Sequence, residues 1–452
     1  MTSVPNITPL DLRQEQSRLQ QLVQDILLEA RKQGASGAEV GVSLDNGLTA
    51  SVRMGEVDTV EFNHDQGFGI TLYYGQRKGS ASTSDSSLQA IIDTVEAASN
   101  IARYTSEDPY AGLADASMMA TDLPELDLYH PWDVEVDHGL EIATRCEQAG
   151  LDVSEQITNS EGASLSTHQS CRVYGNSHGF MGSYLASRQS LSCVLIAGEQ
   201  ERMQRDYWYA VSRKREDLES PESIGTQAAN RTLQRLDPRK IPTCQVPVLF
   251  AAEVASGLLS HLLGAISGSS LYREASFLLN QLDKPLFPEF VSIYERPRLR
   301  GGLASASFDN DGLATYDKSF VQDGVLCSYL LGAYSARKLG MTSTANAGGA
   351  HNLRISDSGL DAPALLRQMG SGLLITELLG QGVNLVTGDY SRGASGFWVE
   401  NGVIQYPVSE ITVAGNLRDM FANVVAVGND VDHRGNVQAG SILIDGMTVG
   451  GD

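Results

Sequence analysis

Runs in which apolar and polar residues alternate fill most of residues 38–74, and they limit the fold of this chain more than any other feature. The runs are AEVGVSLD, LTASVRM, DTVEFN and GFGITLYY. A period of two puts successive side chains on opposite faces of a strand, so this region is predicted to be a meander of antiparallel strands. Asn46-Gly47 is predicted to form a hairpin turn, because both residue types tolerate the left-handed backbone of a type I′ turn.

Helical periodicity precedes and follows these strands. The first predicted helix begins near residue 12, is placed to end at Gly34, and has apolar positions at Leu19, Leu22, Val23, Ile26, Leu27 and Ala30. A second follows the hydroxyl-rich TSDSS and carries Leu88, Ile91, Ile92, Val95 and Ala102. A third is predicted near 136–149, before strand-like runs around 170–215.

The best candidate for a domain boundary is DPRKIP (237–242), where two prolines flank a charged stretch before the apolar strand VPVLFA. A chain of 452 residues is long enough for two or three domains, and we divide it into 1–237 and 238–452. In the second part, Asp311-Gly312, Asp323-Gly324 and Asn401-Gly402 predict hairpins of a large antiparallel sheet system. The predicted fold class is α+β, an N-terminal helix-and-antiparallel-sheet part followed by a large β-rich C-terminal domain.

Charge and hydropathy exclude some classes of partner. The formal net charge of −22 gives no basic surface for phosphate backbones or anionic lipids, so neither nucleic acid nor membrane is expected as a principal partner. No window approaches eighteen uninterrupted apolar residues, and MTSVPNITPLDLRQEQ has no apolar core behind a basic start, so a cytoplasmic protein is expected. The five widely spaced cysteines include no CxxC pair, which argues against a disulfide framework or a zinc ribbon.

GNSHG (175–179) matches the G-x-S-x-G pattern of a hydrolase nucleophile elbow, with Ser177 in the nucleophile position. That elbow needs a helix after the serine, whereas the residues that follow alternate as in a strand. A turn between two strands is therefore favoured. DNDG (309–312) and NDVDHRGN (429–436) resemble fragments of calcium loops but lack the full ladder of oxygen ligands, so ordinary loops are predicted.

The segment 370–417 consists of short strands punctuated by glycines. Within it, GDYSRGASG is predicted to place Asp389, Tyr390 and Arg392 on one tight connection. Glycines let one backbone approach another closely. This suits either dense sheet packing or an extended peptide laid along a sheet edge, and the pattern leaves both open.

Several stretches between about residue 37 and the C-terminus together resemble one family. They include RMGEVDTVEFN, GFGITLYYGQRKGSASTSD, VYGNSHG, SARKLG, AGGAHN and TGDYSRGASGFWVENGVIQYPVSEITVAGNL. The chain resembles the PmbA (TldE) branch of the TldD/PmbA family of metallopeptidase-like proteins. The resemblance implies the helix-and-sheet and β-rich parts described above, a cytoplasmic setting, association into dimers, and action on unfolded peptides, including peptide maturation and antitoxin degradation.

The resemblance also bears on metal binding. In the TldD branch an HExxxH helix and a later cysteine hold a catalytic zinc ion. In LLSHLLGAISG (258–268), Ser260 and His261 stand opposite the family's His-Glu, Ala265 stands opposite its second histidine, and no cysteine follows Cys327. The resemblance therefore implies no metal and no catalytic residue in this chain, with zinc expected in a TldD-type partner. His261 is interpreted as a hydrogen-bonded histidine beside an interface.

Three functional hypotheses follow. The first is the non-catalytic subunit of a cytoplasmic TldD/TldE-type metalloprotease complex, partnered by a TldD-type subunit. The second is a stand-alone peptidase with an unrecognised site, and the third is a homodimeric peptide-binding or modulator protein. Candidate contacts in a peptide or partner groove are His261, Asp389, Tyr390 and Arg392.

Overall fold

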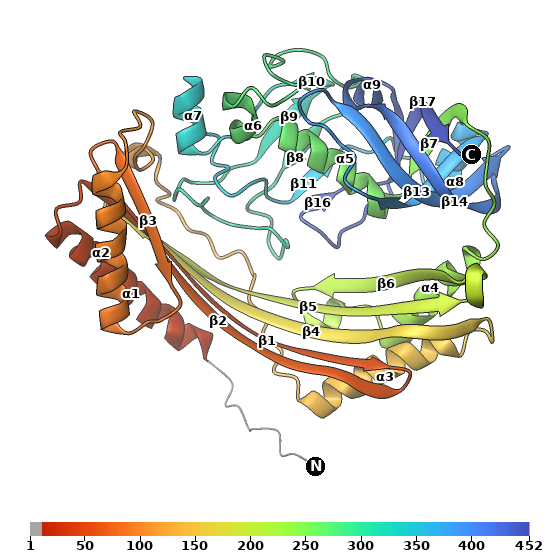
Figure 1. Cartoon of the computed structure of the whole chain (residues 1–452), viewed down its shortest axis with the longest axis horizontal. Coiled ribbons are helices and arrows are strands. Elements are labelled where there is room, and N and C mark those ends of the chain that lie inside the picture. The colour runs from red at the N-terminus through yellow and green to blue at the C-terminus, as the bar shows by residue number, and fades with distance from the viewer. Residues whose placement is uncertain (1–10, 452) are drawn as a thin grey trace.

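The computed structural model describes residues 11–451 (Figure 1). The N-terminal half is built on one sheet in the order β3-β2-β1-β4-β5-β6, with every neighbouring pair antiparallel. Its strands are β1 (Gly37–Arg53), β2 (Glu56–Tyr74), β3 (Arg77–Thr83), β4 (Ile157–Asn176), β5 (Met181–Ala197) and β6 (Gln204–Ser212). The predicted antiparallel meander is confirmed.

Four helices cover the outer face of this curved sheet, and its inner face is turned toward the C-terminal half (Figure 1). They are α1 (Leu12–Lys32), α2 (Leu88–Tyr104), α3 (Val136–Leu151) and α4 (Pro221–Gln234), with 3-10 turns η1 (Ala116–Met118), η2 (Gln200–Arg202) and η3 (Arg215–Asp217). Alternation in the strands explains the two faces: Val40, Val42 and Leu44 of β1 pack in the core beneath α1, whereas the residues between them face the inner side.

The predicted hairpin at Asn46-Gly47 is wrong. Both residues lie inside β1, paired with β2 on one side and β4 on the other. A Cβ atom on Gly47 would lie 2.3 Å from the carbonyl oxygen of Thr167, so glycine is required there by close strand contact. The turn is at Met54-Gly55, with φ of 51° and 77°, and the buried carboxylate of Glu147 on α3 accepts both backbone N–H groups at 2.8 and 2.9 Å.

The C-terminal half contains two further sheets, ordered β14-β13-β12-β7-β17-β15 and β10-β9-β8-β11-β16. The first comprises β7 (Cys244–Phe250), β12 (Gly372–Leu379), β13 (Asp389–Glu400), β14 (Val403–Asn416), β15 (Val424–Val427) and β17 (Ile442–Gly450). The second comprises β8 (Ile293–Glu295), β9 (Lys318–Gln322), β10 (Val325–Leu326), β11 (Leu353–Ile355) and β16 (Val437–Gln438). The helices of the C-terminal half are α5 (Ala252–Ala265), α6 (Gly268–Tyr272), α7 (Ala333–Leu339), α8 (Ala362–Met369) and α9 (Leu417–Ala422).

The hairpin predictions here have mixed outcomes. Asp323-Gly324 and Asn401-Gly402 join β9 to β10 and β13 to β14, all four with positive φ, as predicted. Asp311-Gly312 is a tight turn next to two isolated bridges, Phe308–Ala314 and Met119–Leu313, rather than between two strands. The sheets are mixed rather than antiparallel throughout, because β7 runs parallel to β12 and β11 parallel to β16. The predicted boundary at 237 lies between α4 and β7, and the division into two domains stays a prediction.

Two arginines, Arg213 and Arg337, connect the N-terminal half to the C-terminal half through backbone carbonyl groups. Arg213, at the end of β6, donates to the carbonyl oxygens of Gly302 and Leu303 at 2.8 Å. Arg337 of α7 donates to three carbonyls of the segment 110–113 at 2.7–3.0 Å. Among residues 11–451, no helix has both the length and the apolar character needed to cross a bilayer.

Candidate functional site

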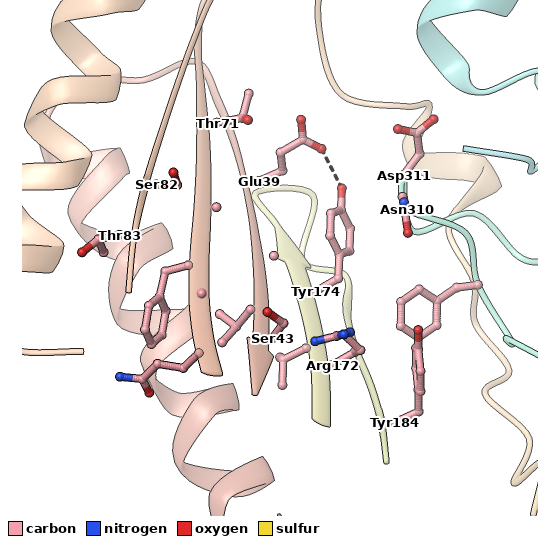
Figure 2. A pocket seen from close by; sticks show the side chains of 18 of the residues that line it. Glu39, Ser43, Thr71, Ser82, Thr83, Arg172, Tyr174, Tyr184, Asn310 and Asp311 are labelled. Carbon is pink, nitrogen blue, oxygen red and sulfur yellow. Dashed lines mark hydrogen bonds between the residues drawn. The ribbon is translucent and has the colours of Figure 1, made fainter. Parts of the chain in front are cut away.

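A cavity of about 980 Å³ lies between the inner face of the N-terminal sheet and the loop 308–311 of the C-terminal half (Figure 2). Its floor comes from β1, β2 and β3, and one wall comes from Arg172, Tyr174 and Tyr184 of β4 and β5. The opposite wall is the loop itself, with Phe308, Asp309, Asn310 and Asp311. Segments more than two hundred residues apart in the sequence therefore enclose one space.

Two carboxylates dominate one end of this cavity. Glu39 of β1 accepts hydrogen bonds from the hydroxyls of Tyr73 and Tyr174 at 2.8 and 2.9 Å, and the second bond is drawn in Figure 2. Asp311 accepts the backbone N–H of Ala333 at 2.7 Å. Burial raises the pKa of both tyrosines, and the charges of Glu39 and Asp311 raise it further. Both carboxylates therefore act on the same two hydroxyls.

At the other end, the positive charge of Arg172 is already matched. Its guanidinium forms a two-point pair with Asp45, with N–O distances of 2.7 and 3.0 Å. His168 lies 3.2 Å from the same carboxylate. Burial opposes ionisation of Asp45, but the hydrogen bonds from His168 and Arg172 hold its pKa below the ordinary value. Arg172 and Asp45 thus contribute no net charge to the cavity.

Asp309 is a buried carboxyl in the loop wall. It accepts the backbone N–H groups of Asp311, Leu313 and Ala347 at 2.9–3.0 Å. Burial, followed by the charge of Asp311, raises the pKa of Asp309 from 3.8 to about 6. Because the folded-state pKa is raised, Asp309 contributes stability below pH 3.8 that is lost as the pH rises toward 6.

We expect Asp311→Asn to lower the pKa of Asp309, because the nearest like charge is removed while the amide oxygen can still accept the Ala333 N–H. Carbon-13 NMR of labelled aspartate carboxyls would measure the titration directly. Asp25→Asn on α1 is the matched control and should leave Asp309 unchanged. An unaltered Asp309 titration in the Asp311 variant would contradict this account.

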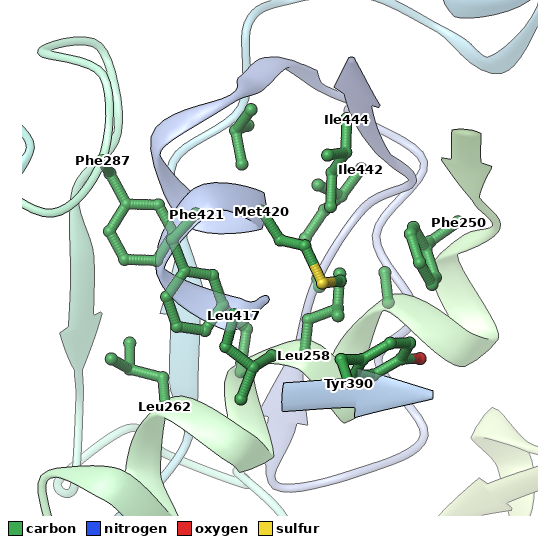
Figure 3. Packing of buried hydrophobic residues seen from close by; sticks show 14 of the residues in the cluster. Phe250, Leu258, Leu262, Phe287, Tyr390, Leu417, Met420, Phe421, Ile442 and Ile444 are labelled. Atoms are coloured by element: carbon green, nitrogen blue, oxygen red, sulfur yellow. The ribbon is translucent and has the colours of Figure 1, made fainter. Parts of the chain in front are cut away.

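A second candidate site lies where α5 meets β13 (Figure 3). His261 of α5 and Tyr390 of β13 have ring centroids 6.0 Å apart at 73°. Burial lowers the pKa of His261, and the charge of Arg392 lowers it further. Tyr390 is 2% exposed, and burial raises its pKa to about 12 although the nearby Arg392 guanidinium opposes the shift. Its hydroxyl makes no hydrogen bond of ordinary geometry in the described part of the chain. The structure thus brings His261, Tyr390 and Arg392 together.

Asp389 does not join them. It is the first residue of β13, not part of a tight connection, and its carboxylate accepts the Thr387 hydroxyl at 2.6 Å and the Asn416 amide at 3.3 Å. It is exposed while Tyr390 is buried, as expected for neighbours on opposite faces of a strand. Whether any of the four predicted groove residues contacts a peptide or partner stays a prediction.

The residues around His261 do not fit a zinc ion. Zinc sites in proteins take at least three nitrogen, sulfur or oxygen ligands. Here the charged neighbour of the imidazole is the Arg392 guanidinium, the Ser260 hydroxyl donates to the Ser256 carbonyl at 3.0 Å, and Ala265 is buried. Among residues 11–451, no three His, Cys, Asp or Glu side chains are grouped so as to hold a metal.

Ser177 lies in the turn between β4 and β5, as predicted, and not in a strand-to-helix elbow. Its hydroxyl accepts the backbone N–H of Ala38 at 3.0 Å. The adjacent His178 is exposed, and its backbone N–H is bonded to Asn176. The two calcium-like segments are loops, and in the second Arg434 pairs with Asp432 at 2.8 Å.

None of the cavity residues was predicted to belong to a site, and DNDG (309–312) was predicted only as an ordinary loop. The available signal was glycine at alternate positions of a strand, Gly67 and Gly69, with Gly41 on the neighbouring strand. Glycine weakens strands, so its repetition on one face marks either close packing or close approach of another molecule.

Comparison with known proteins identifies the class. Three family models match in order: PmbA/TldA metallopeptidase domain 1 at residues 38–102, the central domain at 129–236 and the C-terminal domain at 243–451. The chain belongs to this PmbA/TldA metallopeptidase family.

Its relatives place it in the PmbA branch. It is 53% identical to Metalloprotease PmbA of Escherichia coli O157:H7, with 94% of each chain covered, and 51% identical to the PmbA homolog of Haemophilus influenzae over the whole of both chains. A solved structure from Bacteroides thetaiotaomicron, titled a putative modulator of DNA gyrase, matches with a TM-score of 0.91 at 29% identity, covering 96% of this chain and 99% of that one. TldE from Thermococcus kodakarensis shares the fold, with a TM-score of 0.81 at 18% identity, covering 95% and 100% of the two chains.

Proposed function

We propose that this chain is the PmbA/TldE-type subunit of a cytoplasmic TldD/TldE-type metalloprotease complex that acts on unfolded peptides. A TldD-type subunit supplies the zinc ion and cleaves the peptide bond, and this chain completes the enclosure and helps hold the substrate. The observation that carries the proposal is the α5 environment. In a member of a metallopeptidase family, the helix carries one imidazole beside a guanidinium, a setting that repels a second cation.

The test mixes the purified chain with a TldD-type subunit from the same organism and follows cleavage of an unstructured fluorogenic peptide. We expect cleavage to rise with added chain up to an equimolar ratio, and zinc to stay with the TldD-type subunit in metal analysis. A cleavage rate that does not change when the chain is added would refute the proposal. Cleavage by the metal-free chain alone, abolished by Ser177→Ala with His261→Ala, would favour a stand-alone peptidase. Peptide binding without turnover and without any effect of the partner would favour a modulator.

A free strand edge supports assembly with another chain. Over residues 56–66, β2 pairs with β1 only, since β3 pairs with β2 from Phe68 onward. Val57, Val60 and Phe62 are 60%, 38% and 43% exposed there. An uncovered strand edge is a template for pairing with a further strand.

The charge of this edge favours a different chain over a second copy. The segment 56–66 contains Glu56, Asp58, Glu61 and Asp65 and no lysine or arginine. Antiparallel pairing with an identical segment would therefore bring eight carboxylates together with no lysine or arginine to offset them, which is unfavourable across strands. A partner strand with basic residues meets no such repulsion.

We expect Val60→Lys to weaken association with the TldD-type subunit, because a lysine on an edge strand must be desolvated when the edge is paired. Analytical ultracentrifugation of the mixture measures the dissociation constant, with about a tenfold increase expected. Leu28→Lys on α1 is the control, since Leu28 is a comparably exposed apolar residue (56%) away from the edge. Equal dissociation constants for the two variants would exclude the β2 edge from the interface.

Tyr390→Phe tests the α5–β13 cluster. A buried hydroxyl without a partner costs about 1–3 kcal/mol, so the variant of the isolated chain should be more stable by about 1 kcal/mol in urea unfolding. If the hydroxyl is kept for a peptide or partner group, the same variant should raise KM in the mixture. Lower stability of the variant would show that the hydroxyl is satisfied within the chain.

A further inference from the structure

Three glycines form a bare patch on the floor of the cavity. Gly41 of β1 pairs with Gly69 of β2, and Ser43 pairs with Gly67 two residues further along. All three belong to the inner face, whereas Val42 and Phe68 between them are buried under the helices. Over this patch the cavity is bounded by peptide groups rather than side chains.

Within residues 11–451, no backbone conformation or steric contact requires glycine at these positions. None of the three has a positive φ. A Cβ atom on Gly41 would meet no heavy atom within 4 Å, one on Gly69 only a carbonyl oxygen at 3.8 Å, and one on Gly67 only the Ser43 hydroxyl at 3.4 Å. Gly175 on β4 is different, because a Cβ there would lie 2.7 Å from Val23.

The lack of side chains over this patch is therefore best explained by a molecule that binds in the cavity. Glycine in a strand interior is destabilising relative to other residues, so three of them without a packing role reduce the stability of the sheet. They give room for another molecule to lie flat against the sheet. The aromatic side chains of Tyr174, Tyr184 and Phe308 bound that space on the other side.

The charges along the cavity select the chemical group. Arg172 is neutralised by Asp45, as described above. Glu39 and Asp311 take their hydrogen bonds from tyrosine hydroxyls and a backbone N–H, and neither forms an ion pair with a cationic side chain among the described residues. The Arg337 guanidinium, whose charge reaches Tyr73, is hydrogen-bonded to backbone carbonyl oxygens and not to these carboxylates. Two carboxylates without an ion-pair partner, partly shielded from water, favour a positively charged hydrogen-bond donor.

We propose that this cavity binds a primary ammonium group carried on a slender extended chain. Glu39 and Asp311 accept hydrogen bonds from the ammonium group, and the chain that carries it lies over the patch of Gly41, Gly67 and Gly69. The preference for an ammonium group follows from the cavity alone. That its carrier is a peptide, through its N-terminal amine or a lysine, rests on the proposed function.

Isothermal titration calorimetry on the isolated full chain tests this, since every lining residue belongs to this chain. The probes are pentaalanine amide with a free N-terminus, the same peptide N-acetylated, and N-acetyl-Ala-Ala-Lys-Ala-Ala-amide. We expect the two ammonium peptides to bind about tenfold or more tightly than the acetylated pentaalanine. Equal affinities for all three, or binding of none, would overturn the proposal.

Variants locate the binding. Gly41→Leu should weaken ammonium-peptide binding about tenfold or more without lowering the melting temperature, because the added side chain enters open space. Ser51→Leu adds the same side chain to the same face of β1 outside the cavity lining and should have no effect. Glu39→Gln should abolish the preference for the ammonium peptides and, unlike Gly41→Leu, leaves the space unchanged. Unaltered affinity in both the Gly41 and Glu39 variants would place binding elsewhere.

These measurements need neither metal nor partner. Ammonium-selective binding with no stimulation of a TldD-type subunit would refute the proposed function and keep the cavity proposal. Stimulation of a TldD-type subunit without ammonium-selective binding would refute the cavity proposal and keep the proposed function.

Discussion

Lys318→Met should lower the free energy of unfolding by about 3–5 kcal/mol, the usual cost of leaving one member of a buried ion pair uncompensated. The partner that would be left is Glu295, whose side chain is fully buried and accepts the Lys318 ammonium. It also accepts the Asn346 amide and the His351 backbone N–H, both at 2.8 Å, and these two donors are neutral. The His351 imidazole lies further away, with Nδ1 3.8 Å from the carboxylate.

The destabilisation caused by Lys318→Met should depend on pH, and the direction of this dependence follows from the pKa of Glu295. Burial opposes ionisation of Glu295, but the His351 side chain and the Lys318 charge hold its pKa below the ordinary 4.5. In the native chain Glu295 therefore contributes stability above pH 4.5 that is lost as the pH falls through the folded-state pKa. Without Lys318 burial dominates, so the destabilisation should be larger at pH 7 than at pH 4.

Urea unfolding at both pH values measures this. Lys32→Met on α1 is the control, since Lys32 is a surface residue that forms an exposed ion pair with Glu29, and it should change stability by about 0.5 kcal/mol or less. Glu295→Gln combined with Lys318→Met should recover part of the loss, because no charge is then left buried. Full stability of the single variant at pH 7 would be inconsistent with a buried ion pair.

This network matters for the cavity because it orders the segment 346–352. Glu295 holds Asn346 and His351, and the backbone N–H of Ala347, between them, donates to Asp309 of the loop wall at 3.0 Å. The Lys318 variant should therefore also weaken ammonium-peptide binding, although Lys318 does not line the cavity.

Gly225→Ala should destabilise the chain by about 3 kcal/mol, at the upper end for overpacking. Gly225 lies where α4 crosses α3, and a Cβ there would be 1.9 Å from the carbonyl oxygen of Cys146 and 3.0 Å from the backbone nitrogen of Gly150. Both atoms belong to the helix backbone, so the two helices would have to separate. The cost should exceed the gain of about 1 kcal/mol that alanine brings to a helix.

Gly257→Ala on α5 measures the helix propensity of alanine relative to glycine in the absence of a steric clash. A Cβ on Gly257 would meet nothing within 4 Å, so this substitution should stabilise by up to about 1 kcal/mol. Thermal unfolding of the two variants should shift in opposite directions. Equal shifts would mean that the close approach of α3 and α4 is not under steric control.

The local elements followed from short-range pattern. The apolar face of α1 and the alternation along β1 and β2 predicted these elements, and Asp323-Gly324 and Asn401-Gly402 form the turns that their chemistry favours. Asn46-Gly47 shows the limit, because such a pair permits a turn without requiring one. The turn formed instead at Met54-Gly55, where Glu147 from α3 accepts the backbone N–H groups.

The same limit applies to the candidate sites, one of which could be predicted from the sequence and one of which could not. The glycine-rich segment 370–417 singled out Asp389, Tyr390 and Arg392, and the family resemblance singled out His261. The structure brings His261, Tyr390 and Arg392 together, whereas strand alternation separates Asp389 from Tyr390. The cavity could not be predicted, since Glu39, Tyr174 and Asp311 meet only when the sheet curves toward the loop 308–311.

By itself, the sequence determined the periodicities, hence the helices, the strands and which side chains share a face, and it determined the family. Tertiary structure alone decided which glycines lie against backbone and which face open space, and which carboxylates lack an ion-pair partner among the described residues. The physical reason is that periodicity acts between neighbours a few residues apart, whereas steric contact and charge act through space between segments that only the folded chain brings together.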